Sequence, residues 1–215
     1  MAYRKDSFAI KEFYHVYNRG NSKQVIYKDV ADFNLMQQLL FLCNTSNSVS
    51  MKDAQERKSG VYSYDRKQLL VAIGAYSLLP NHFHILLTPL VEDGVSQFMR
   101  KVCTGYAMYF NKKYTRTGSL FEGKFRAKHA ATDQYLKYLY AYIHLNPVKK
   151  PNKKTPRKDL GVAVVYSHSS LQDYIDSTRD EAMILLPEEF PKYFVSNVEV
   201  KNTLLEWLNN KPDNL

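Results

Sequence analysis

A ten-residue stretch that begins at Leu79, LPNHFHILLT, constrains the fold more than any other part of the chain. Its Pro-Asn pair indicates a turn between two apolar runs, and the residues that follow alternate as in a β-strand. The alternation places Phe83 on one face of the strand and both His82 and His84 on the other. At roughly 3.3 Å per residue the two imidazoles lie about 7 Å apart and can reach one ion. The pattern predicts two ligands of a metal site, with two solvent-facing histidines as the alternative.

Composition indicates one folded protein of moderate size. The chain has 215 residues, of which 45% are hydrophobic, enough for one packed core with an appendage or for two small domains. Cys43 and Cys103 lie far apart, which favours neither a disulfide framework nor a zinc knuckle and is typical of a reducing compartment. The sequence shows no signal peptide and no apolar run that could span a membrane. We therefore expect a soluble protein of the cytoplasm with no membrane partner.

Charge is distributed unevenly along the chain. Residues 1–158 carry 26 basic and 11 acidic side chains, whereas residues 159–215 carry 4 basic and 10 acidic ones. This break predicts a basic domain over residues 1–158 and an acidic C-terminal extension over residues 159–215. A basic domain of this kind suits a polyanion, because each phosphate that it neutralises releases counterions. The alternative is a basic surface that serves only solubility.

Several elements are expected before the histidine strand. Periodicity and turn residues predict a strand over residues 12–20, a helix capped by Asp29 or Asp32 that runs to Cys43, a polar loop insertion over residues 44–60, and a strand over residues 69–77. The last of these meets the histidine strand across the Pro-Asn turn, so the two are predicted to pair as a hairpin.

The region after the histidine strand is basic and aromatic. Phe98, Val102 and Tyr106 are spaced as one face of a helix that starts after Gly94, and residues 115–130 are predicted to form a turn and a strand. Between Arg100 and Lys128 there are eight basic residues and one acid. Basic side chains interleaved with Phe and Tyr suit phosphate contacts and base stacking. The candidate DNA-binding residues are Arg100, Lys101, Lys112, Lys113, Arg116, Lys124, Arg126 and Lys128.

The next predicted helix carries two stripes. It starts near Thr132 or Asp133 and stops at Pro147. Leu136, Leu139 and Ile143 form an apolar stripe, and beside it lie Tyr135, Tyr138, Tyr142 and Asn146. Such a tyrosine stripe is more often packing than chemistry, yet Tyr142 and Asn146, four residues apart, would face the same neighbour. Because Asn146 precedes a proline, we expect it at the helix end and outside helical geometry.

Three segments together resemble a known family. LPNHFH from Leu79, GSLFEGKF from Gly118 and YIHLNPV from Tyr142, in this order and spacing, closely resemble the REP-associated tyrosine transposases. These belong to the single-tyrosine HUH transposases, named after a histidine, hydrophobic, histidine motif. The resemblance covers roughly residues 10–150.

The resemblance implies a fold and a chemistry. The fold is α+β, a ferredoxin-like antiparallel sheet with the histidine pair on an inner strand and helices packed on one face, followed here by a mostly helical C-terminal extension. His82 and His84 match the metal ligands, Tyr142 the nucleophile, and Asn146 the polar residue that completes the metal site. Mg²⁺ or Mn²⁺ is the implied ion.

The implied reaction is cleavage and rejoining of single-stranded DNA next to hairpins through a 5′-phosphotyrosine intermediate. A monomer is expected, with a dimer as the alternative. Two rival functions stay open on the residues alone. One is a non-catalytic nucleic-acid-binding module on the same fold, and the other is a hydrolase that uses the histidine-bound metal without the tyrosine.

Overall fold

A four-stranded antiparallel sheet forms the centre of the protein. The computed structural model describes residues 8–57, 59–148, 159–175, 178–194 and 196–209. The strands are β1 (Tyr14–Arg19), β2 (Val71–Leu79), β3 (His82–Pro89) and β4 (Arg126–His129), in the spatial order β2-β3-β1-β4. The histidine strand β3 is therefore an inner strand, as predicted, and it pairs with β2 across the expected turn, with Leu79 opposite His82.

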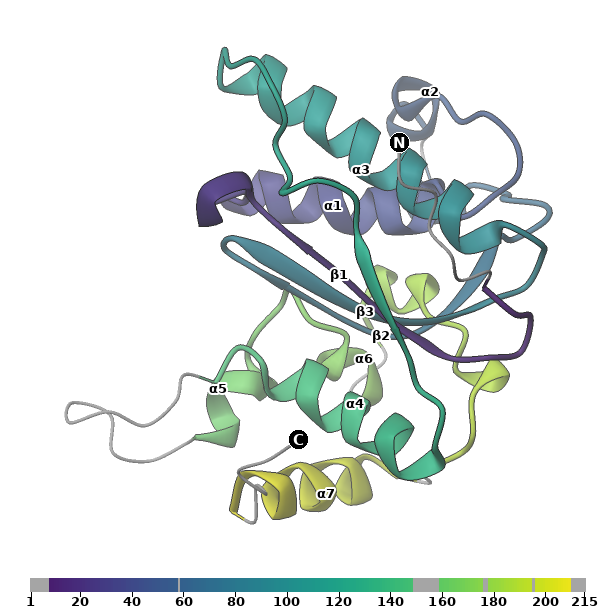
Figure 1. Ribbon diagram of the computed structural model, residues 1–215, viewed down its shortest axis with the longest axis vertical. Coiled ribbons are helices and arrows are strands. Elements are labelled where there is room, and N and C mark those ends of the chain that lie inside the picture. Colours follow the sequence, from purple (N-terminus) through teal and green to yellow (C-terminus); the bar gives the residue numbers. More distant parts are fainter. Residues whose placement is uncertain (1–7, 58, 149–158, 176–177, 195, 210–215) are drawn as a thin grey trace.

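Three long helices pack against this sheet (Figure 1). Helices α1 (Val30–Leu42) and α3 (Gly94–Lys113) lie together above one face, and α4 (Asp133–Leu145) lies below the other. The order β1-α1-β2-β3-α3-β4 is the βαββαβ arrangement of ferredoxin-like folds. The predicted α+β class and its topology are confirmed.

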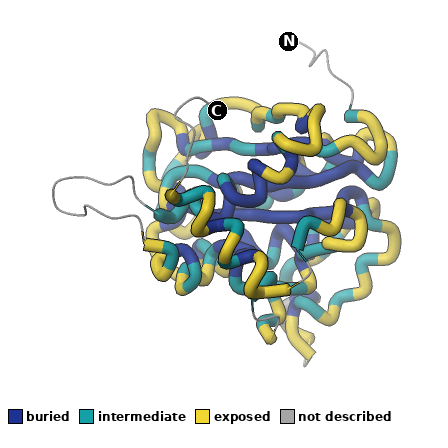
Figure 2. Tube along the Cα trace, turned by 90° about the horizontal axis from the view of Figure 1, so that it is seen from below, coloured by how far each residue is buried: buried dark blue, intermediate teal, exposed yellow. Residues whose placement is uncertain are grey.

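Helices cover both faces of the sheet, not one face as predicted. All nine residues of β2 are buried, so each of its faces needs a packing partner. Phe83 and Ile85 belong to a core shared with α1 and α3, whereas Leu86 on the same strand packs in a second cluster with Leu139 of α4. Figure 2 shows the buried segments in the middle of the molecule and the exposed ones around its outside. The apolar residues on the histidine face are what recruit α4.

Two regions differ in detail from the prediction. The polar insertion at 44–60 contains a short helix, α2 (Met51–Gln55), which begins where the Ser50 side chain accepts a hydrogen bond from the Asp53 amide. This local cap explains a helical turn in a stretch without an apolar face. The predicted strand in residues 115–130 is confined to β4, because Gly123 adopts a left-handed φ of 74° and only an isolated bridge joins Gly20 to Phe121.

The C-terminal extension packs on α4 and on the edge of the sheet. Its helices are α5 (Leu160–Val164), α6 (Leu171–Ile175) and α7 (Asn197–Asn209), and it also contains short 3-10 turns at Asp180–Ile184 and Pro187–Glu189. Two further 3-10 turns, Asn21–Lys23 and Val61–Ser63, lie earlier in the chain. Ser169 forms a bridge with Ser77 of β2, and the Leu78 amide donates to the His168 carbonyl at 2.9 Å. Within the described ranges, no helix is both long and apolar enough to cross a membrane. The predicted boundary after residue 158 adjoins residues 149–158, outside the described residues.

Candidate active site

His82 and His84 lie side by side on the face of the sheet that α4 covers. Their ring centroids are 5.0 Å apart and the ring planes are nearly perpendicular. His84 is buried and His82 is half-buried. The strand alternation predicted from the sequence therefore holds, and it separates both imidazoles from Phe83, which points into the opposite core.

A third histidine, His15, joins the pair from the neighbouring strand β1. The antiparallel register places Tyr17 opposite His84 and His15 opposite Leu86. The His15 Nε2 atom lies 2.8 Å from the Nδ1 atom of His84, and the two rings stack. No role for His15 was apparent from the sequence. The available signal was its place in an alternating strand, but the strand register that brings it to His84 is not readable from the sequence.

Burial keeps the three imidazoles neutral. It lowers the pKa of His15 to about 4, helped by the positive charge of Lys128. Burial also lowers the pKa of His84 well below its ordinary value, and the neighbouring His15 and His82 add to the effect. The pKa of His82 falls for the same main reason, although a hydrogen bond with Asn146 opposes the shift. Neutral imidazole is the form that binds metal ions.

The Nδ1 atoms of His82 and His84 each have a hydrogen-bond partner within the protein. The Asn81 amide group donates to the Lys23 carbonyl, which turns its oxygen to His82 Nδ1 at 2.7 Å. An amide oxygen only accepts, so His82 carries its proton on Nδ1 and keeps the lone pair of Nε2. His15 Nε2 is the acceptor that would hold His84 in the same tautomer. Partners of this kind orient histidines in metal sites.

The donor set suits an ion whose remaining ligands come from elsewhere. Among the described residues, no group of three or more His, Cys, Asp or Glu side chains is placed to hold a metal ion. His82 and His84 would therefore need an amide and substrate or water oxygens to complete a shell. Mg²⁺ and Mn²⁺ accept such mixed ligation, and imidazole favours Mn²⁺ of the two. The residues present fit the implied ion.

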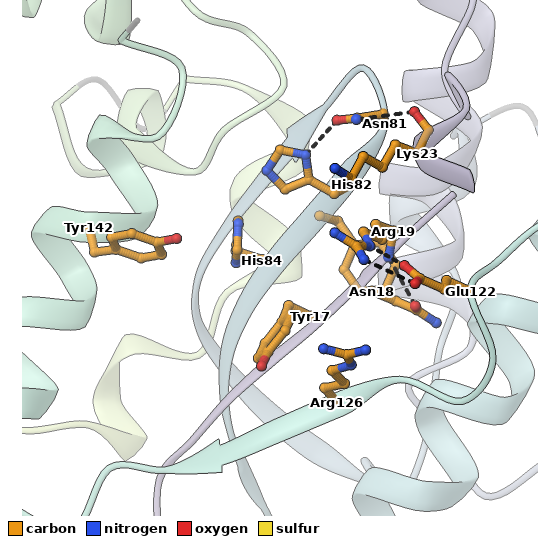
Figure 3. A pocket seen from close by; sticks show the side chains of 11 residues that line it. Tyr17, Asn18, Arg19, Lys23, Asn81, His82, His84, Glu122, Arg126 and Tyr142 are labelled. Atoms are coloured by element: carbon orange, nitrogen blue, oxygen red, sulfur yellow. Dashed lines mark hydrogen bonds and ion pairs between the residues drawn. The ribbon is translucent and has the colours of Figure 1, made fainter. Parts of the chain in front are cut away.

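Helix α4 carries Tyr142 to the histidine pair. The helix begins after Thr132, whose side chain accepts from the Tyr135 amide. The Tyr142 ring meets the His84 ring edge-on at 5.3 Å and the His15 ring at 5.7 Å. Figure 3 shows the phenol oxygen of Tyr142 directed toward His84. A potential nucleophile thus faces the potential metal ligands from across the site.

Asn146 is brought to the same place, one turn further along α4. It forms the C-cap of the helix, and its side chain hydrogen-bonds His82. Its position at the helix end is as predicted. Its backbone is helical, however, with φ −59° and ψ −33°, so the expectation from the following proline was wrong. Its backbone amide donates a hydrogen bond to the Ile143 carbonyl, and its side chain hydrogen-bonds His82. These two bonds outweigh the tendency of a residue before proline to avoid helical geometry.

A cavity of about 330 Å³ opens between these groups. Three cationic side chains line it, and sequence analysis singled out only one of them, Arg126. Arg19 follows His15 and Tyr17 on the same face of β1, where it forms an ion pair with Glu122. Lys23 comes from the 3-10 turn after β1, with a left-handed φ of 60°. The full lining is Tyr17, Asn18, Arg19, Lys23, Asn81, His82, Phe83, His84, Glu122, Arg126 and Tyr142.

The structure divides the candidate DNA-binding residues into two groups. Arg126 and Lys128 lie on β4 beside the site, and Lys124 is exposed just before that strand. Arg100 and Lys101 line a different cavity, between α1, α3 and the loop after α1. Lys101 also donates to the Thr45 and Asn47 carbonyls. These two cations therefore lie away from the histidine face.

The other basic residues at the end of α3 serve mainly local structure. Lys113 forms ion pairs with Asp29 and with the buried Asp32, both at 2.7 Å. Arg116 donates to the Asn111 side chain and to the Ser119 carbonyl. Lys112 is exposed on α3, and this helix lies on the opposite side of the sheet from α4.

Comparisons with known proteins agree with this arrangement. A solved structure described as the REP-associated tyrosine transposase bound to a REP hairpin matches the fold with a TM-score of 0.50. It is 15% identical in sequence, and the match covers 89% of this chain and 91% of that chain. A search of curated proteins gives no match. The family model for IS200-like transposases matches residues 31–146, more than half of the chain, including the histidine pair, Tyr142 and Asn146. A transposase-like role in DNA processing follows, and the chain belongs to the IS200-like transposase family.

Proposed function

We propose that this protein cleaves and rejoins single-stranded DNA next to hairpins through a 5′-phosphotyrosine intermediate. The observation that carries the proposal is the phenol oxygen of Tyr142 facing two neutral, oriented histidines in a cavity lined by cations. A fold shared with a transposase that binds a REP hairpin supports a DNA hairpin as the recognised feature.

In the proposed reaction the Tyr142 oxygen attacks the scissile phosphorus. The new bond joins that oxygen to phosphorus, and the bond between phosphorus and the 3′ oxygen of the preceding nucleotide breaks. The phenol proton passes to water, and the leaving 3′ oxygen gains a proton. Arg126 and Lys23, which line the cavity, offset the negative charge of the phosphate. Rejoining is the reverse attack by a 3′-hydroxyl, so the covalent link conserves the energy of the broken bond.

His82, His84 and Asn146 are the proposed ligands of Mg²⁺ or Mn²⁺. A bound ion would supply a Lewis acid that polarises the phosphate. All three ligands are neutral, so the protein alone should hold the ion weakly, and a negative phosphate oxygen of the substrate would strengthen its binding. Asn81 holds the His82 ring, and His15 would hold the His84 ring, in the tautomer whose Nε2 carries no proton.

One chain supplies every residue of this site. Tyr142 comes from α4 and Asn146 from its C-cap, and the histidines come from β3. Ser170 links α4 to β2. Its hydroxyl oxygen lies 2.9 Å from Nε2 of His144 on α4 and accepts a hydrogen bond from the backbone amide of Tyr76 on β2 at 2.9 Å. We propose that the protein acts as a monomer, because a single chain provides all the proposed catalytic and metal-binding residues. A dimer that exchanges α4 would first have to break these contacts.

The test is covalent capture of DNA. End-labelled single strands that carry the hairpins flanking the gene are incubated with Mn²⁺ or Mg²⁺ and resolved on a denaturing gel. We expect a protein-linked band with wild type, none after removal of divalent ions by EDTA, and none with Tyr142→Phe, which removes only the hydroxyl. Tyr64→Phe is the matched control and should behave as wild type, because Tyr64 packs against the core on the other face of the sheet and lines neither cavity beside Tyr142.

Each other outcome points elsewhere. If the band survives Tyr142→Phe, Tyr138 or Tyr135 becomes the nucleophile. If DNA binds tightly and no band forms with either metal, the non-catalytic binding module is the better account. If DNA is cleaved without a covalent band and Tyr142→Phe cleaves equally well, the histidines serve a hydrolase.

A further inference from the structure

A second cavity, of about 320 Å³, lies on the other side of the Tyr142 ring. It shares Tyr17, His84 and Tyr142 with the active-site cavity, so these residues stand between the two. Its remaining wall comes mainly from the tyrosine stripe of α4, with Lys128 of β4 facing that stripe. We call this space the aromatic chamber. The catalytic mechanism above assigns it no task.

The rings of the chamber are arranged as a platform. Tyr135 and Tyr138 stack with centroids 5.9 Å apart and planes 26° apart, and Tyr138 and Tyr142 follow at 5.8 Å and 34°. The Nζ atom of Lys128 lies 4.4 Å from the centroid of the Tyr135 ring. The tyrosine stripe, which the sequence favoured as packing, therefore lines a cavity with one stacked pair of rings, a third ring tilted by 34°, and a cation over the face of Tyr135.

Flat aromatic walls beside a cation fit one chemical class well. A nucleobase stacks on tyrosine rings whatever its identity, and the attached phosphate pairs with a lysine. Sugars and aliphatic ligands would use neither the parallel rings nor the cation as fully. Because Tyr142 also borders the active-site cavity, a base held here belongs to a nucleotide adjacent to the phosphate that Tyr142 faces.

We propose that the aromatic chamber binds the base of a nucleotide next to the scissile phosphate, by stacking on Tyr135 and Tyr138, with Lys128 on its phosphate. The proposal rests on the proposed function, because it takes single-stranded DNA as the substrate. It adds a binding site that holds the strand on the far side of Tyr142, so that the backbone must pass the phenol oxygen. Stacking would be tolerant of base identity and would not itself read the hairpin.

The chain contains a natural reporter for this site. Its single tryptophan, Trp207 of α7, lies with its ring centroid 5.1 Å from that of Tyr138. A base that stacks on Tyr138 changes the surroundings of the only indole in the protein. The acidic extension therefore contributes to the proposed site through the contact of Trp207 with Tyr138.

The experiment compares two ligands and four proteins without divalent ions. The ligands are a single-stranded thymidine octamer and an abasic octamer with the same phosphates, both measured by fluorescence anisotropy and by Trp207 emission. The background is the full chain carrying Tyr142→Phe, which keeps the ring wall and prevents cleavage. In this background we compare the parent with Tyr135→Leu, Tyr135→Phe and Tyr64→Leu. Tyr64 is a matched control because a cation, Arg57, lies 4.8 Å from its ring and because Tyr64 does not line the chamber.

We expect the thymidine octamer to bind more tightly than the abasic one and to change Trp207 emission. Tyr135→Leu should weaken thymidine binding about 5- to 150-fold, the range for loss of one stacked base, and leave abasic binding unchanged. Tyr135→Phe and Tyr64→Leu should bind as the parent does. Equal binding of both octamers, or a Tyr135→Leu variant that binds thymidine as the parent does, would overturn the proposal.

The outcome is separable from that of the cleavage test. Base-dependent binding that needs Tyr135, in a protein that forms no covalent band, keeps the chamber and removes the transferase. A covalent band in wild type together with base-independent binding does the reverse.

Discussion

The two faces of the sheet are built from the same strands and do different work. On the face toward α1 and α3, Phe83, Ile85 and their neighbours are almost fully buried in a continuous apolar core. On the face toward α4, His82 and His84 alternate with those same residues and border two cavities. When one face of a strand packs in a rigid core, the side chains on its other face are also held in fixed positions. The apolar face thus serves the chemistry by fixing where the histidines point.

The largest effect should separate two adjacent residues of β3. His84→Ala should lower the yield of covalent DNA adduct by at least about 100-fold, because even loss of a residue that merely supports a metal ligand costs ~10–100-fold. Phe83→Ala should lower the free energy of unfolding by about 3–5 kcal/mol through the cavity that it leaves. Adduct yield and urea denaturation measure the two. If His84→Ala destabilises the protein as much as Phe83→Ala does, the histidine face is simply another part of the core.

His15 should be the next most sensitive position. His15→Phe removes the acceptor of His84 Nδ1 while filling the space, and we expect about 10–100-fold less adduct at limiting Mn²⁺. Excess Mn²⁺ should restore much of the yield, and His15→Gln, which can still accept a hydrogen bond, should lose less. A variant whose adduct yield matches that of wild type at every Mn²⁺ concentration would show that His15 does not contribute to the site.

His144 tests whether the packed side of α4 excludes water from a buried imidazole. Burial lowers the pKa of its imidazole to about 3, so below pH 6.5 the unfolded chain takes up a proton that the folded protein refuses. Stability therefore falls as the pH drops from about 6.5 toward 3. Between pH 7.5 and pH 5 wild type should lose about 2 kcal/mol more than His144→Gln. Denaturation at both pH values measures this, and parallel losses would mean that His144 is open to water.

The smallest effect concerns cations on opposite sides of the sheet. Arg126→Gln or Lys128→Gln should reduce the slope of log affinity against log salt by about 0.7 for each lost contact with single-stranded DNA. Lys112→Gln on α3 should leave the slope unchanged. Equal changes for Lys112 and Arg126 would extend the DNA footprint over both faces and blur the distinction between them.

Sequence reasoning succeeded where the information is local. The alternation around His82 and His84, the helix that presents Tyr142 and the turn between β2 and β3 all depend on neighbours in the chain. The resemblance to a family supplied what periodicity cannot, namely that Tyr142 and Asn146 belong with the histidines. The structure places these four residues around one site.

What escaped prediction depends on contacts between distant segments. His15 and Arg19 reach the site only through the register of β1 against β3. Lys113 looked available for DNA, but it pairs with Asp29 and Asp32, more than 80 residues away in the sequence. The cover on both faces of the sheet likewise follows from which apolar residues of β2 and β3 find a partner helix. None of these has a local sequence signature.

Identification of the DNA-linked peptide is the most direct test of the central claim. Adduct formed with wild type is digested with nuclease and protease, and the peptide that carries residual nucleotide is sequenced by mass spectrometry. We predict a 5′-phosphate on the oxygen of Tyr142 and on no other residue. A nucleotide on Tyr138, Tyr135 or any side chain outside α4, or an adduct joined through a 3′-phosphate, would contradict the account.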